Sequence, residues 1–149
     1  MLWRAATTVA LFLVIQWCCG ASLRIFTDEE LSRGTGEDGA PLLLSMAGLV
    51  FDVAEGREFY GPSGPYHCFA GTACTNALTI GSLADEDRND EVTAFTLDDL
   101  EEMRGLLHEV YLAKYSVVGH LQSWLDTHGC VGDDAIEILE AAITAHTEL

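Results

Sequence analysis

Two tyrosines stand six residues apart on either side of a Gly-Pro-Ser-Gly-Pro segment, and their side chains are well suited to chemistry. Tyr60 and Tyr66 flank this turn-forming segment, and the only lysine, Lys114, directly precedes Tyr115. A deprotonated tyrosine is a hard anionic ligand that suits ferric iron, and tyrosine is one of the known axial ligands of haem. A nearby hydroxyl and an ammonium group can hydrogen-bond such a phenolate and fix its direction. Spacing alone leaves an alternative open, in which these are half-buried tyrosines with hydrated hydroxyl tips.

Other catalytic arrangements are not found in the sequence. The five histidines lack the spacing of a metal site and are typical of surface or core histidines: His67, His108, His120, His128 and His146. No second histidine completes a zinc-protease helix, and no nucleophile elbow, phosphate-binding loop or dinucleotide fingerprint is present. The acidic pairs at 98–99 and 101–102 lie in the first turns of an expected helix, where carboxylates favour the helix dipole. We therefore expect a binding protein and not a self-contained enzyme.

The chain is strongly acidic. It has 149 residues, with 7 basic and 24 acidic side chains and a formal net charge of −17. Nucleic acid and anionic membrane surfaces both require positive charge for binding, so neither is expected as a partner. A protein partner would be expected to present a basic surface. The length is that of about one domain, and hydrophobic residues make up 49% of the chain, enough for a core.

The first 21 residues resemble a secretory signal peptide. Arg4 supplies a charged start, residues 9–15 form an unbroken apolar run, and small residues follow at 19–21. The alternative is a signal anchor over residues 5–21, which is at the short end of the membrane-spanning range. We expect cleavage, so that the mature domain is secreted or stays in the endoplasmic reticulum lumen. Membrane association would require that this segment be retained.

Three cysteines follow residue 21, an odd number for an oxidising compartment. Cys68 and Cys74 lie on an expected helix over residues 65–77, separated by about 9 Å along its axis, which is too far for a disulfide. Any bridge would therefore involve Cys130. Free or buried thiols are the favoured interpretation.

The order of the expected elements indicates an α+β fold. Thr27 and Glu30 form a capping box for a short helix over residues 28–33. Two apolar runs that meet at an Ala-Gly turn predict a β-hairpin over residues 42–54. A strand is expected over residues 115–121 and an amphipathic helix over residues 133–149. A further helix is expected from residue 97 to 110, with an apolar face of Leu97, Leu100, Met103, Leu107 and Val110.

Four segments, in this order, resemble the membrane-associated progesterone receptor family, a branch of the cytochrome b5-like haem/steroid-binding domains. They are LRIFTDEEL, AGLVFDVAEGREFYGPSGPYHCFAG, FTLDDLEEM and AKYSVVGHL, and together they cover about residues 23–121. The signal-like start followed by one domain is most similar to the secreted members. The resemblance implies a cytochrome b5-like domain over residues 22–121, with residues 122–149 as a C-terminal helical extension. The apolar side of this extension is expected to dock on the domain.

The resemblance also implies a cofactor and its ligands. Family members bind haem non-covalently through a tyrosine at the position of Tyr66, which leaves the iron five-coordinate. Side chains matching Tyr60, Lys114 and Tyr115 line the pocket and hydrogen-bond around that ligand, and all four residues are present here. The HPGG motif, which carries a haem-binding histidine of cytochrome b5 itself, is absent.

Two features bear on how haem would be held. The family's Arg-Asp-Ala-Ser segment is replaced by Thr-Ala-Cys-Thr at residues 72–75, which removes charged contacts near the pocket. His67 follows Tyr66 directly, and neighbours on a helix point about 100° apart, so both side chains cannot easily face one iron.

Three functions follow as hypotheses. The first is a haem-binding secreted or luminal domain with a signalling or haem-handling role. The second is a module whose pocket takes a steroid, another apolar ligand or a protein partner, with haem weak or absent. The third is a low-potential electron carrier, because a phenolate ligand favours Fe(III).

Overall fold

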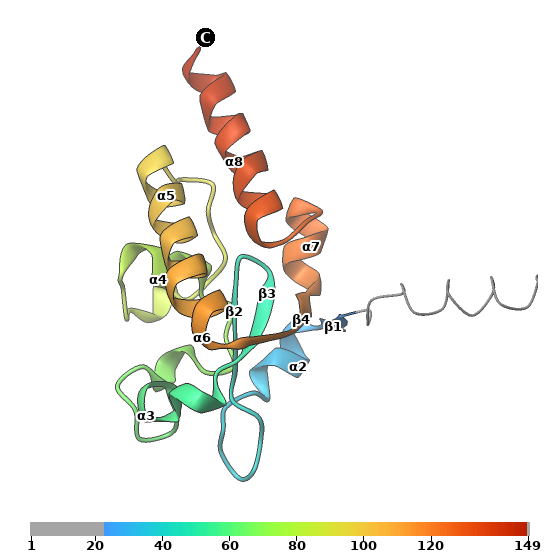
Figure 1. Cartoon of the computed structure of the whole chain (residues 1–149), viewed down its shortest axis with the longest axis vertical. Helices are drawn as coiled ribbons and strands as arrows, with labels where there is room; N and C mark the ends of the chain where they lie inside the picture. The colour runs from blue at the N-terminus through green and yellow to red at the C-terminus, as the bar shows by residue number, and fades with distance from the viewer. Residues whose placement is uncertain (1–22, 149) are drawn as a thin grey trace, which may run out of the picture.

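The structure, a computed structural model, describes residues 23–148. A four-stranded sheet lies at its centre in the order β1-β4-β3-β2 (Figure 1). Strand β1 (Arg24–Phe26) pairs in parallel with β4 (Ser116–Leu121), whereas β3 (Leu49–Asp52) is antiparallel to both β4 and β2 (Leu43–Met46). A mixed sheet surrounded by short helices confirms the α+β prediction.

Short helices surround the sheet. The α-helices are α2 (Asp28–Ser32), α3 (Arg57–Tyr60), α4 (Thr75–Ile80), α5 (Leu97–Leu106), α6 (Leu112–Lys114), α7 (Gln122–His128) and α8 (Gly132–Thr147). Three 3₁₀ turns, η1 (Ala54–Gly56), η2 (His67–Phe69) and η3 (Asp85–Asp87), and a π-helical turn, η4 (Leu107–Tyr111), complete the set. Helix α4 packs on β2, α5 packs on α4, and α8 packs on α5, so these helices form one side of the molecule (Figure 1).

The expected hairpin is present and forms the middle of the core. Ala47 and Gly48 both have positive φ, 52° and 74°, as a tight two-residue turn between antiparallel strands requires. Every residue of β2 is buried, and Val50 and Phe51 of β3 are fully buried. Strand β2 contacts both α2 and α4, and Ala73 forms a bridge with its residue Ser45. The capping box of Thr27 and Glu30 at the start of α2 is also confirmed.

The prediction of one helix over residues 65–77 is wrong, because the chain leaves helical geometry between η2 and α4. Gly71 has φ +72° and donates its N–H to the carbonyl of Leu43, and Ala73 forms a parallel bridge with Ser45. These contacts hold the segment against β2 as an extended connection. Phe69 in this segment is buried. The three cysteines, Cys68, Cys74 and Cys130, are free thiols, so the bridge considered for Cys130 does not form.

The second half of the chain contains both expected and unexpected helices. Helix α5 begins with a capping box of Thr96 and Asp99, but Leu97 is 47% exposed and does not belong to the apolar face. Helix α7 was not expected. The C-terminal helix is present as α8, which is joined to α5 by an ion pair between Arg104 and Glu140 at 2.7 Å.

The N-terminal segment expected as a signal peptide, residues 1–21, lies outside the described residues. Within residues 23–148, no helix combines the length and the apolar character that crossing a bilayer requires.

The start of α4 is held by a side chain from another segment. Cys74 occupies the N-cap position without a capping side chain, and Asp90 supplies the missing acceptor. Its Oδ1 atom accepts from the Thr75 backbone N–H at 3.3 Å and from the Thr75 hydroxyl at 2.6 Å. The same Thr75 hydroxyl oxygen accepts from the N–H of Ala47 at 3.0 Å. Thr75 therefore ties α4 to both the hairpin turn and the acidic loop over residues 84–91, which contains Asp90.

Ionisation of the Asp90 carboxyl group is energetically unfavourable in this position. Its Oδ2 atom is buried without a hydrogen-bond partner among residues 23–148. Burial raises the pKa of its carboxyl group to about 6, while the two hydrogen bonds from Thr75 lower it by less. The folded state therefore binds a proton at Asp90 more tightly than the unfolded chain does.

We predict that Gly48→Ala lowers the free energy of unfolding by about 2–4 kcal/mol, because a new Cβ would overlap the ring of Trp124 in α7 and strain the left-handed backbone. Gly39→Ala is the matched control, since Gly39 has φ +79° and no neighbour within 4 Å of a new Cβ. The control should lose only about 1 kcal/mol from backbone strain. Urea unfolding measures both losses, and equal losses would contradict this contact between the hairpin turn and α7.

We predict that Asp90→Asn gains stability relative to the unchanged protein as the pH rises from 4 to 7. An amide can still accept from Thr75 but never becomes charged. In the unchanged protein, stability from Asp90 is greatest where the carboxyl is protonated and falls as the pH passes from about 3.9, its ordinary pKa, to about 6.

The relative gain of Asp90→Asn should be on the order of 2–3 kcal/mol, the free energy of a two-unit pKa difference. Urea unfolding at several pH values between 4 and 7.5 measures it. Asp38→Asn, on an exposed loop, controls for the loss of one carboxylate. A stability difference between Asp90→Asn and the unchanged protein that stays constant with pH would show that Asp90 is not buried as described.

Candidate functional site

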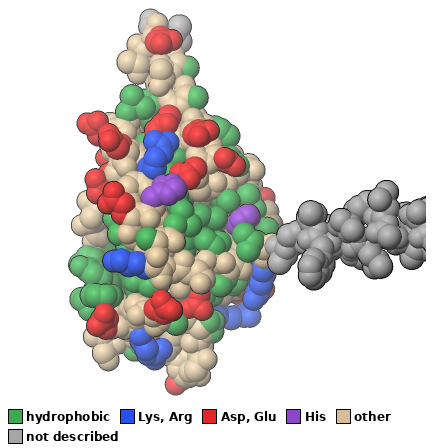
Figure 2. Space-filling model, viewed as in Figure 1, with side chains coloured by type: hydrophobic (Ala, Val, Ile, Leu, Met, Phe, Trp, Pro, Cys, Tyr) green, Lys and Arg blue, Asp and Glu red, His purple; other side chains and the backbone are tan. Residues whose placement is uncertain are grey.

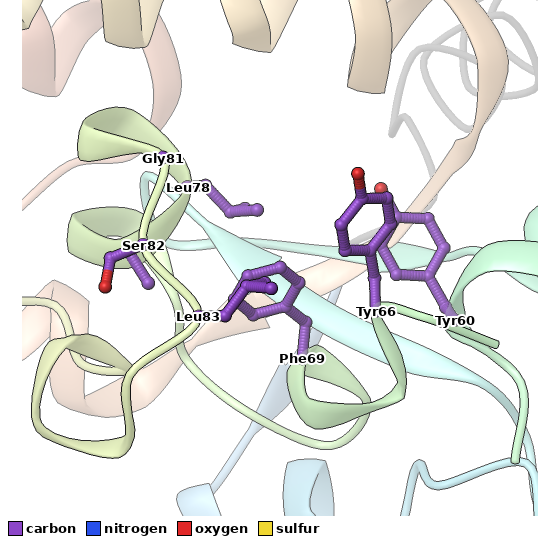
Figure 3. A pocket seen from close by; sticks show the side chains of 8 residues that line it. Tyr60, Tyr66, Phe69, Leu78, Gly81, Ser82 and Leu83 are labelled. Atoms are coloured by element: carbon purple, nitrogen blue, oxygen red, sulfur yellow. The ribbon is translucent and has the colours of Figure 1, made fainter.

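A cavity of about 310 Å³ opens between the segment of Tyr60 and Tyr66 and the helix α4 with its following turn. Figure 3 shows the hydroxyl groups of Tyr60 and Tyr66 pointing in the same direction, with Phe69 and Leu83 beside the rings. The lining is formed by Tyr60, Tyr66, Phe69, Ala77, Leu78, Gly81, Ser82 and Leu83. Apolar walls with a few convergent polar atoms are typical of a small-molecule site.

The Gly-Pro segment sets the two tyrosines side by side. Helix α3 ends at Tyr60, and the chain returns so that the N–H of Tyr66 donates to the carbonyl of Phe59 at 2.8 Å. Gly64 lies so close to this carbonyl that a Cβ would overlap the Phe59 oxygen, which explains the glycine. As a result the Tyr60 and Tyr66 ring centroids are 6.3 Å apart.

The two tyrosines differ in exposure. Tyr60 is 7% exposed, whereas Tyr66 is 41% exposed and lies between the rings of Tyr60 and Phe69, the latter 6.2 Å away and nearly parallel. Because Tyr66 lines the cavity and is partly exposed, its side chain is accessible to a ligand. The arrangement thus gives Tyr66 and Tyr60 different environments, one accessible and one enclosed.

A fourth tyrosine, which sequence reasoning missed, supports Tyr60 from behind. The hydroxyls of Tyr60 and Tyr111 are 2.9 Å apart in the protein interior. Burial raises the pKa of both hydroxyls, and for Tyr60 the hydrogen bond with Tyr111 opposes part of that increase. The available signal in the sequence was the four-residue spacing of Tyr111 and Tyr115, which predicts one helix face.

Tyr115 belongs to the same aromatic cluster. Its ring lies edge-on to Tyr60 at 6.1 Å and is 6.0 Å from Tyr111. Its hydroxyl packs directly against Gly56, where no Cβ would fit. Burial raises the pKa of Tyr115, and the nearby carboxylates of Glu58 and Glu55 raise it further.

Lys114 lies at the end of α6 with an exposed side chain and does not line the cavity. Of the arginine and lysine side chains in the part of the chain that the structure describes, it alone makes no hydrogen bond. The structure therefore brings Tyr60, Tyr66 and Tyr115 together, with Lys114 beside them as an available positive charge.

His67 turns away from the cavity. Its Nδ1 atom lies 2.9 Å from the backbone carbonyl oxygen of Tyr60, and its Nε2 atom lies 3.8 Å from a carboxylate oxygen of Glu37. The ring nitrogens thus face a backbone carbonyl and an exposed carboxylate, and His67 is not among the residues that line the cavity. This geometry disfavours His67 as a ligand for anything bound beside Tyr66.

A second cavity, of about 560 Å³, lies against α7 and differs in chemistry. Its lining is mostly polar and acidic and consists of Asn89, Asp90, Glu91, Val92, Thr93, Ser123, Trp124, Thr127 and His128. Trp124 is almost fully buried and its ring is covered by that of His128 at 4.1 Å. This cavity is larger, but most of the residues that line it are polar and none of them is a tyrosine.

Comparison with known proteins identifies relatives over most of the chain, although no protein-family model matches it. Membrane steroid-binding protein 2 of Arabidopsis thaliana is 36% identical over 97 residues, which are 64% of this chain and 41% of that protein. Neuferricin of Homo sapiens is 32% identical over 145 residues, 97% of this chain and 54% of neuferricin. Membrane-associated progesterone receptor component 2 of Homo sapiens is 34% identical over 105 residues, 66% of this chain and 45% of that protein. The chain thus spans about half the length of these curated relatives.

A solved structure agrees with the sequence relatives. A hypothetical protein from Arabidopsis thaliana, described as having a cytochrome b5 like fold, matches with a TM-score of 0.61 and 34% identity, covering 68% of this chain and 94% of that one. The chain therefore belongs to the membrane-associated progesterone receptor family of cytochrome b5-like steroid- and haem-binding domains.

Proposed function

We propose that this protein binds haem in the tyrosine-lined cavity, with the phenolate oxygen of Tyr66 as the axial ligand of ferric iron. The observation that carries this proposal is the exposed Tyr66 side chain, which lines a largely apolar cavity and has its hydroxyl on the same side as that of a second, enclosed tyrosine (Figure 3). A bound metal ion favours the deprotonated form of its ligand, so iron would lower the proton affinity of Tyr66. Haem bound here would supply a ferric centre with a single protein ligand.

The residues around the cavity fit such a group. Phe69, Leu78 and Leu83 offer apolar surface for a flat macrocycle, and Tyr60 offers a hydroxyl next to the iron ligand. Lys114 lies outside the lining, and its exposed ammonium group is available to an anionic substituent of the ligand. We assign binding to the domain of residues 22–121 and treat residues 122–149 as its helical extension.

A second candidate is an apolar ligand such as a steroid, with haem weak or absent. Large hydrophobic side chains stand exposed near the opening, namely Phe59, Ile80 and Leu83. One relative is named a membrane steroid-binding protein, which supports this candidate. The same cavity would then bind through its walls, and Tyr60 and Tyr66 would donate hydrogen bonds to a ligand oxygen.

The biological role that we propose is signalling or haem handling within the secretory pathway, in the lumen or after secretion. Neuferricin and the progesterone receptor component, as relatives, support a secretory or membrane-associated setting. Figure 2 shows acidic side chains over α5 and α8, with few basic ones between them. A protein partner on this side would present a basic surface.

We predict that haemin bound to the purified protein gives a ferric phenolate absorption spectrum, and that Tyr66→Phe abolishes this spectrum. The same substitution should weaken haemin binding at least about tenfold, because one iron ligand is lost. Titration followed by visible absorption measures both effects.

His67→Gln is the control, because it removes the neighbouring imidazole while keeping a side chain that can hydrogen-bond the Tyr60 carbonyl. Its spectrum should equal that of the unchanged protein. A spectrum that survives in Tyr66→Phe would refute Tyr66 as the ligand. Absence of haemin binding in the unchanged protein would favour the apolar-ligand candidate, which binding of radiolabelled progesterone then tests.

A further inference from the structure

Tyr111 is a buried polar side chain next to the cavity and is not part of its lining. It is 2% exposed, and its hydroxyl oxygen lies 2.9 Å from that of Tyr60. Neither hydroxyl makes another hydrogen bond within residues 23–148. The direction of this single hydrogen bond therefore decides which of the two hydrogens has an acceptor.

The surroundings favour Tyr111 as the donor. If Tyr60 donated to Tyr111, the hydrogen of Tyr111 would remain buried without an acceptor, which costs about 1–3 kcal/mol. If Tyr111 donates to Tyr60, both hydrogens are accommodated, because Tyr60 lines the cavity and can direct its own hydrogen to water or a ligand there. The second arrangement leaves no buried donor unpaired.

The position of Tyr111 is fixed by the helix that carries it. It is the last residue of η4, where the N–H of Leu112 donates to the carbonyl of Leu107 in a π-helical pattern. Its ring packs 5.4 Å from Phe51 of β3 and 6.0 Å from Tyr115. Single π-helical turns often occur at functional sites, where the extra residue changes the direction of the following side chains.

We propose that Tyr111 is a positioning residue that makes Tyr60 a hydrogen-bond donor toward an oxygen atom in the cavity. With the Tyr60 oxygen occupied as an acceptor from Tyr111, its own hydrogen is free for another acceptor, and the Tyr66 hydroxyl lies on the same side of the two rings in Figure 3. The oxygen that receives it is the phenolate of Tyr66 when iron is bound. This consequence rests on the proposed function of the cavity, whereas the direction of the hydrogen bond does not.

The direction is tested without any ligand, by urea unfolding of Tyr60→Phe, Tyr111→Phe and the double variant. Tyr60→Phe removes the only acceptor of the buried Tyr111 hydroxyl, so it should lower the unfolding midpoint most. Adding Tyr111→Phe should then raise the midpoint again, because the unpaired donor disappears. Tyr111→Phe alone should be the milder single change. Additive midpoint shifts, or a larger loss in Tyr111→Phe than in Tyr60→Phe, would overturn the proposal.

The consequence for the cavity is tested by haemin titration of the same three variants. Tyr111→Phe should shift the ferric phenolate band in the same direction as Tyr60→Phe, and the double variant should add nothing further. Phe51→Leu is the control, because it loosens the packing of Tyr111 but keeps both hydroxyls, and it should leave the band in place. Independent, additive band shifts for the two tyrosines would refute the positioning role. If the unchanged protein does not bind haemin, the proposed function fails, and the unfolding experiment still decides the hydrogen bond.

Discussion

The site depends on one backbone hydrogen bond, from the N–H of Tyr66 to the carbonyl of Phe59. It closes the loop that begins where α3 ends, and thereby brings two tyrosines six residues apart in sequence to neighbouring positions. The approach of Gly64 to this carbonyl is too close for any side chain. Prolines at positions 62 and 65 restrict the same loop before it folds, so little conformational freedom remains to be lost. Replacing Gly64 or either of the two prolines would therefore change the shape of the cavity, although none of these residues lines it.

The opposite wall of the cavity is helix α4, which is held in place by side-chain hydrogen bonds. Helix α4 is only six residues long, too short to be stable by itself, and it begins without a capping side chain of its own. Thr75 compensates by joining the hairpin turn at Ala47 to the carboxyl group of Asp90. One wall is therefore held by a closed loop of backbone and the other by a buried polar link to the acidic loop. The cavity between them is bounded by two segments that are far apart in sequence and are secured separately.

Local signals in the sequence were sufficient for much of the fold. The capping box of Thr27 and the Ala-Gly turn are each determined by neighbouring residues, and both are observed. The helix expected over residues 65–77 failed because a non-local contact intervenes: Gly71 and Ala73 bind the edge of β2, which no local pattern reveals. Helix α7 was missed because its burial against β4 is created by the fold and not by a long apolar period.

Part of the candidate site could also be predicted from the sequence. The spacing around the Gly-Pro segment and the resemblance to a family together drew attention to Tyr60, Tyr66, Lys114 and Tyr115, and the structure gathers the three tyrosines into one cluster. Tyr111 was missed because its contact with Tyr60 joins residues that are 51 positions apart, a contact that only the fold creates. Lys114 is adjacent to the cluster, although its side chain is directed to solvent and not into the cavity.

The proposed function requires that a flat ligand occupy the cavity between Tyr66 and α4. The most direct measurement is a two-dimensional NMR titration of the ¹⁵N-labelled protein with gallium(III) protoporphyrin IX, a diamagnetic analogue of haemin. We expect amide shift changes at Tyr66, Phe69, Leu78 and residues 81–83, which line that cavity. Shift changes centred instead on Thr93, Ser123 and Thr127, which line the polar cavity beside α7, or no changes at all, would contradict it.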